Sequence, residues 1–91
     1  MGSKNKRMFK AMNEFEQLHF LGTATRVTVA KITRVENGHL VNYFVPKVRG
    51  LIIRKGDGEL LFKSPDEARK IGRKILIRWK KELTELEKNQ N

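Results

Sequence analysis

Apolar residues recur at three- and four-residue steps near the start of the chain. Met8, Ala11, Met12, Phe15 and Leu18 follow this spacing, which places them on one side of a helix. The pattern predicts a first helix over about residues 5–18. Residues 19–25 then carry one glycine and two threonines, and this composition predicts a break before the next element.

β-Branched residues dominate the segment that follows. Residues 26–35 (RVTVAKITRV) have the composition of a strand, although the apolar alternation shifts near Ala30, where we expect a bulge or a twist. Asn37-Gly38 then separates this run from a second one, and this dipeptide is a strong signal for a hairpin turn. The returning strand is predicted at residues 39–45, and Pro46 either ends it or marks an edge bulge.

The middle of the chain continues as a predicted antiparallel meander. Residues 48–54 read as a third strand, residues 55–58 (KGDG) as a second tight turn, and residues 59–63 as a short fourth strand. Three or four strands are therefore expected in one sheet.

A helix start follows the strands. Ser64 and Glu67 have the spacing of a capping box, and Pro65 fits the first helical position. Behind them an apolar stripe runs over about five turns; its members are Ala68, Ile71, Ile75, Leu76, Trp79, Leu83 and Leu86. Gly72 interrupts this stripe and costs about 1 kcal/mol of helix propensity relative to alanine, which close packing of the helix on the sheet would offset.

These elements predict an α+β fold. It has an N-terminal helix, a three- or four-stranded antiparallel sheet and a long C-terminal amphipathic helix packed on one sheet face. A chain of 91 residues supports one small domain, residues 1–91. Its ends, at about residues 1–5 and 88–91, are expected to be disordered.

Composition narrows the classes of function. The chain contains no cysteine, which excludes disulfides and thiolate metal sites and fits a cytoplasmic location. No apolar run approaches the ~20 residues of a membrane-spanning helix. The net charge is +10, with 20 basic and 10 acidic residues. Such a chain attracts polyanions, and nucleic acid is the first partner to consider.

Few residues of the chain could act in catalysis. His19 and His39 are isolated and lack the spacing of a metal-binding motif, and Ser64 is explained as a helix cap. We therefore expect no catalytic residue, no metal, no cofactor and no enzymatic activity.

Basic residues of the strands are the first candidates for nucleic-acid contacts. An arginine-bearing sheet, covered by a helix on one side, can present its open face to a major groove. The alternative is a polar face that serves only solubility. Tyr43 is the aromatic residue most suited to exposure. The strand candidates are Arg26, Lys31, Arg34, Lys47, Arg49, Arg54 and Lys55.

The last helix adds a basic face opposite its apolar stripe. Its candidates for phosphate contacts are Arg69, Lys70, Arg73 and Lys80. Ile77 lies in the middle of this basic arc, where it predicts a contact surface for nucleic acid or for an acidic protein, or a packing site for the N-terminal helix. Leu83 and Leu86 extend the stripe beyond the reach of a short sheet, so the chain is expected to be a monomer or a homodimer through this helix.

Residues 58–68 (GELLFKSPDEA) form a turn, a short strand and a helix start. This segment resembles the N-terminal arm-site DNA-binding domains of tyrosine recombinases over about residues 40–80. The resemblance implies a three-stranded sheet inserted into the major groove. The chain differs in its N-terminal helix, its longer last helix and the lack of a following catalytic domain, so an accessory protein is implied, not an integrase. The element order is also similar to that of double-stranded-RNA-binding domains, but residues 64–67 replace the lysine-rich opening of their second helix.

The leading hypothesis is a non-enzymatic protein that binds double-stranded DNA as an accessory or regulatory factor of a phage, plasmid or mobile element. The second is a protein-interaction module or inhibitor that docks its basic surface and exposed Ile77 on an acidic partner. The third is an RNA- or ribosome-associated protein, which shares the same electrostatics.

Overall fold

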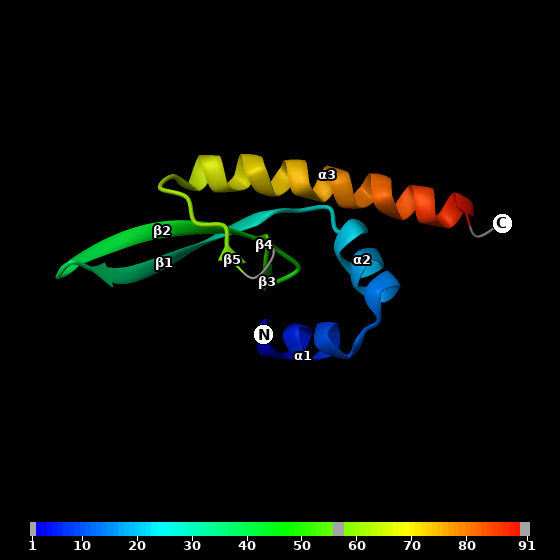
Figure 1. The fold of residues 1–91 in the computed structure, drawn as a ribbon, viewed down its shortest axis with the longest axis horizontal. Coiled ribbons are helices and arrows are strands. Elements are labelled where there is room, and N and C mark those ends of the chain that lie inside the picture. Colours follow the sequence, from blue (N-terminus) through cyan, green and yellow to red (C-terminus); the bar gives the residue numbers. More distant parts are fainter. Residues whose placement is uncertain (1, 56–57, 90–91) are drawn as a thin grey trace.

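The computed structural model describes residues 2–55 and 58–89, and it has the predicted α+β architecture (Figure 1). In chain order the elements are α1 (Gly2–Ala11), α2 (Glu14–Gly22), β1 (Thr28–Glu36), β2 (His39–Val48), β3 (Leu51–Ile52), β4 (Arg54–Lys55), β5 (Gly58–Glu59) and α3 (Pro65–Asn89). Helix therefore reaches into both terminal segments that were expected to be disordered.

The N-terminal segment forms two helices, so the prediction of one helix over residues 5–18 is wrong. Asn13 caps α2 through a reciprocal pair of hydrogen bonds with Glu16. The backbone N–H of Glu16 donates to Asn13 Oδ1 at 2.8 Å, and the backbone N–H of Asn13 donates to Glu16 Oε1 at 3.1 Å. This capping box starts a new helix where the apolar spacing alone indicates a continuous one. The second helix then continues to Gly22, past the predicted start of the break.

The β1–β2 hairpin closes through the predicted turn. Asn37 and Gly38 both have positive φ, at 52° and 78°, as a type I′ turn requires. The register is uninterrupted from the Thr28–Lys47 pair to the Glu36–His39 pair, so the bulge expected near Ala30 does not form. The shift in alternation has another cause: both faces of the sheet carry partly buried apolar residues, Val29 on one face and Ile32 on the other.

Strand β2 does not end at residue 45, because Pro46 fits inside it. Phe44 exchanges both backbone hydrogen bonds with Phe62, on the side away from β1. The carbonyl of Pro46 points the same way and accepts from the N–H of Ile53. The missing N–H of Pro46 therefore faces the interval between Phe62 and β3, and no hydrogen bond with β1 is lost.

The third strand is much shorter than predicted. Arg49 and Gly50 have φ values of 50° and 79° and turn the chain directly after Val48, so β3 pairs only with the last two residues of β2. The next residues leave this sheet, and β4 pairs with β5 in a separate two-stranded ribbon. The predicted strand 59–63 is reduced to the end of β5 and the bridge at Phe62. Residues 56–57 of the predicted turn lie outside the described residues.

Helix α3 packs on one face of the sheet, as predicted. Ser64 Oγ accepts from the N–H of Glu67 at 3.4 Å at its start. A Cβ added at Gly72 would lie 2.6 Å from Val27 Cγ1 and 2.8 Å from Pro46 Cβ. This confirms that the glycine permits close contact with the sheet. Beside it, Leu76 joins the core formed with Ala24, Val48 and Ile53.

The part of α3 beyond the sheet is covered by α2. A Cβ at Gly22 would lie 3.3 Å from Leu83 Cδ2, and Leu83 is only 7% exposed. Leu83 is therefore part of the monomer core and is not available for the expected dimer contact, whereas Leu86 remains 42% exposed.

Candidate nucleic-acid interface

The outer face of α3 carries a row of lysines. Gly72, Leu76 and Leu83 are buried, and at about 100° per residue the positions opposite them are exposed in the structure. Glu67 and Glu85 are among them. We call the lysines on this side, with Ile77, the outer stripe; its members are Lys70, Lys74, Ile77, Lys81 and Lys88. From Lys70 to Lys88 the outer stripe spans about 27 Å, at about 1.5 Å per residue. Figure 1 shows α3 along one long edge of the molecule, with no other element over this side.

Two shallow grooves flank the centre of the outer stripe. One is lined by Asp66, Arg69, Lys70, Arg73, Lys74 and Ile77. The other is lined by Ile77, Lys80, Lys81, Thr84, Glu85 and Lys88. Ile77 belongs to both grooves and is 55% exposed. The N-terminal helices do not cover it, so the packing role considered for Ile77 is wrong.

Most cations on this face keep their charge available. Within the described residues, Lys70, Arg73, Lys74 and Lys81 have no carboxylate within ion-pair distance. Arg69 is the exception, since its Nη1 lies 3.5 Å from Asp66 Oδ1. Lysines that are not neutralised by neighbours raise the local potential for an incoming anion.

Lys80 has a structural role that the sequence did not reveal. Its ammonium group donates to the backbone carbonyl of Gly22 at 2.9 Å and to that of Ala24 at 2.8 Å. These carbonyls lie at and just after the end of α2, where the helix leaves acceptors unsatisfied and carries partial negative charge. Lys80 thus joins α2 to α3, and we remove it from the predicted phosphate contacts.

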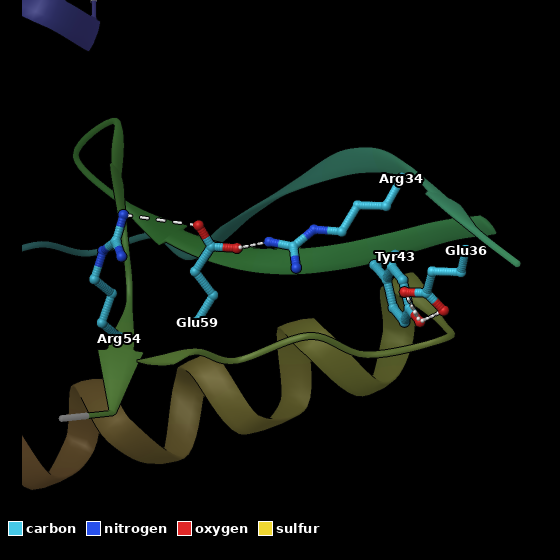
Figure 2. A network of polar contacts seen from close by, with 5 residues as sticks. All are labelled: Arg34, Glu36, Tyr43, Arg54 and Glu59. Carbon is cyan, nitrogen blue, oxygen red and sulfur yellow. Dashed lines mark hydrogen bonds and ion pairs between the residues drawn. The ribbon is translucent and has the colours of Figure 1, made fainter. Parts of the chain in front are cut away.

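The basic residues of the sheet do not gather on one open face. Pro46 contacts α3, so strand alternation and the register place Lys31 on the α3 face and Arg34 and Lys47 on the opposite one. That opposite face is partly covered by the β4–β5 ribbon. Arg34 Nη2 lies 2.6 Å from Glu59 Oε2 of the ribbon, and Arg54 Nη2 lies 3.8 Å from Glu59 Oε1 (Figure 2). The predicted arginine-bearing open face therefore does not form.

The remaining strand candidates are also dispersed. The guanidinium of Arg49 lies 5.0 Å from the centroid of the Phe20 ring and donates to Thr23 Oγ1 at 3.4 Å, so it connects the β2–β3 turn to α2. Arg26 is exposed ahead of β1. Lys55 ends β4, and its side chain lies outside the described part of the chain.

Tyr43 is not an open stacking platform. Its hydroxyl donates to both carboxylate oxygens of Glu36, at 2.8 and 2.7 Å (Figure 2), and Lys63 Nζ lies 4.4 Å from the ring centroid. The hydrogen bond to Glu36 is the main reason that the pKa of Tyr43 is raised above 10.0, with smaller contributions from desolvation and from the charge of Glu36. Lys63 thus covers one face of the Tyr43 ring, where a base would otherwise be able to stack.

Lys74, Lys81 and Lys88, which are not among the predicted helix contacts, are exposed on the same side of α3 as Lys70. Their signal in the sequence is a spacing of seven, which keeps residues on nearly one line of a helix. The sequence alone does not separate these lysines from basic residues at the edge of the basic arc, such as Arg69.

No protein-family model, curated protein or solved structure matches the chain. No helix in the described residues is long and apolar enough to cross a membrane. The same part of the chain contains no group of three or more histidine, aspartate or glutamate side chains placed to hold a metal ion.

Proposed function

We propose that this chain is a non-enzymatic DNA-binding protein that contacts duplex DNA with the outer stripe of α3. The observation that carries the proposal is a row of exposed lysines on a helix whose opposite face is fixed in the core. This row replaces the sheet arginines as the proposed contact surface.

Electrostatics would supply most of the binding. Each phosphate neutralised by a lysine releases condensed counterions, so affinity rises as salt concentration falls. A helix is about 10–12 Å in diameter with its side chains, and the major groove of B-DNA is about 12 Å wide. The outer stripe could therefore lie in the groove or along its phosphates. Arg73, at its edge, carries the planar fork suited to guanine.

A competition experiment tests this function. Labelled duplex DNA is titrated with the protein at low salt, and bound duplex is competed with unlabelled duplex, single-stranded DNA or structured RNA of equal length. We expect duplex DNA to be the strongest competitor. Both nucleic acids attract the lysines through their phosphates, so the competition separates them by shape. Stronger competition by structured RNA would assign the protein to RNA instead.

Ile77 favours a second candidate function, the docking of an acidic protein. An exposed isoleucine among lysines is typical of the core of a protein interface more than of a phosphate contact. If duplex DNA is the partner, Ile77→Gln should change duplex affinity by less than about threefold, because Ile77 carries no charge. Loss of duplex binding in Ile77→Gln, with the fold intact by circular dichroism, would contradict a phosphate-based interface.

A further inference from the structure

A cavity of about 510 Å³ opens between the N-terminal helices and the β3–β4 region. Its wall is apolar and comes from four parts of the fold: α1, α2, the β3–β4 segment and α3. The apolar lining residues are Phe9, Leu21, Leu51, Ile52, Ile53 and Trp79. Gln17 Nε2 donates to the carbonyl of Phe9 at 3.0 Å and ties α1 to α2 beside the cavity. The volume falls in the range of about 300–1,000 Å³ that is typical of small-molecule sites.

Among the described residues that line this cavity, every charged one is cationic. Lys6 and Lys10 come from α1, one helical turn apart, whereas Lys47 and Arg54 come from β2 and β4. No aspartate or glutamate is among its described lining residues. Glu59 lies 3.8 Å from Arg54 but outside the lining. An apolar interior with positive charge from three elements is complementary to a molecule that has an apolar body and a single anionic head.

We propose that this cavity binds a free alkyl carboxylate, with the chain against the apolar wall and the carboxylate among the four cations. A small molecule fits better than a peptide because several elements surround the space and its volume is limited. The site is separate from the outer stripe: Trp79 and Ile77 lie about 160° apart around α3, at about 100° per residue. The two sites can therefore be altered independently.

Trp79 provides a direct readout, since it is the only tryptophan of the chain and lines the cavity. The full chain is titrated with decanoate below its micelle concentration, and Trp79 emission is followed. We expect a saturable change with one decanoate per chain. Butyrate should give no saturation because its apolar body is too short, and decanol should bind at least about fivefold more weakly because it lacks the charge.

Charge variants separate the cavity from the overall positive charge. Lys47→Gln with Arg54→Gln should weaken decanoate binding about tenfold, because two of the four partly exposed cations at the carboxylate are removed. Lys6→Gln with Lys10→Gln tests the α1 side of the rim and serves if the first pair unfolds. The matched control, Lys74→Gln with Lys81→Gln, removes two charges from the outer stripe and should leave decanoate affinity unchanged.

Several results would overturn the proposal. Equal weakening in the control pair would show that decanoate responds only to net charge, and equal binding of decanol would show that the cationic rim has no role. A Trp79 change with anionic phosphatidylglycerol vesicles but not with decanoate would assign the surface to a membrane. Tighter binding of an acidic amphipathic peptide would assign it to a protein segment.

Discussion

At the residue scale, side chains that look equivalent in the sequence have different roles in the structure. Lys80 and Lys81 are neighbours in a basic run, but Lys80 donates two hydrogen bonds to the end of α2, whereas Lys81 belongs to the outer stripe. The difference depends on which side of α3 meets α2. A partner 56 or 58 residues away leaves no local signal.

Replacing Lys80 by methionine should therefore destabilise the protein. The change keeps the apolar stem but removes both hydrogen bonds to the carbonyls, and hydrogen bonds to charged groups contribute about 1.5–3 kcal/mol. We expect the free energy of unfolding, measured by urea denaturation, to fall by about 1–2 kcal/mol after allowance for partial exposure. Lys81→Met is the matched control and should change it by less than about 0.5 kcal/mol. Equal effects would show that the Lys80 bonds do not stabilise the fold.

Tyr43 gives a prediction for pH. It is the only tyrosine of the chain, so the ultraviolet absorbance of tyrosinate reports it alone. We expect its midpoint above 10.0, because the hydrogen bond to Glu36 favours the protonated hydroxyl. Glu36→Gln should lower the midpoint. Since the folded-state pKa is raised, this contact stabilises the fold fully below pH about 10 and is lost as pH rises through the folded-state pKa. An unchanged midpoint in Glu36→Gln would contradict this.

At the element scale, the packing of α3 on the sheet depends on Gly72. Alanine at this position would gain about 1 kcal/mol of helix propensity. Its Cβ, however, would lie 2.6 Å from Val27 Cγ1 and 2.8 Å from Pro46 Cβ, and Pro46 is fully buried with little freedom to move. Steric overlap should therefore exceed the gain in propensity.

We predict that Gly72→Ala lowers the free energy of unfolding by about 1–2 kcal/mol, within the usual range for overpacked sites. Thermal or urea denaturation followed by circular dichroism measures the change. Lys74→Ala, on the exposed side of the same helix, should be neutral or slightly stabilising. A more stable Gly72→Ala variant would mean that α3 does not approach the sheet as closely as described.

Local signals account for the elements that the sequence predicted well. The Asn37-Gly38 turn and the Ser64 cap are each encoded within four residues. The turn occurs as predicted, and Ser64 Oγ accepts from the N–H of Glu67, which is one half of the predicted capping box. The Asn13–Glu16 capping box is equally local, but the apolar spacing continues through it and predicts one helix where there are two. The prediction that Pro46 ends the strand is wrong for another reason. Pro46 fits inside β2 because its missing N–H faces a gap between Phe62 and β3, and no short segment of sequence encodes the position of that gap.

At the scale of the whole molecule, basic residues are spread over several elements, and the outer side of α3 carries four of the exposed lysines in one row. The predicted arginine surface of the sheet does not form as one open face. Glu59, 25 residues after Arg34 in the sequence, pairs with Arg34 and lies near Arg54. The periodicity of α3 predicts that the helix has a basic face. The residues at the centre of that face depend on which side of α3 is buried, and this follows from the tertiary packing. The remaining outer stripe is the central element of the proposed function.

The most direct test of this proposal is the salt dependence of duplex DNA affinity, measured for the intact chain and for Lys74→Gln with Lys81→Gln. Arg26→Gln with Lys31→Gln removes the same charge away from the outer stripe and serves as the control. If the outer stripe contacts phosphates, the slope of log affinity against log salt should fall by about two in the stripe variant and by much less in the control. Equal slopes in all three proteins would contradict the account.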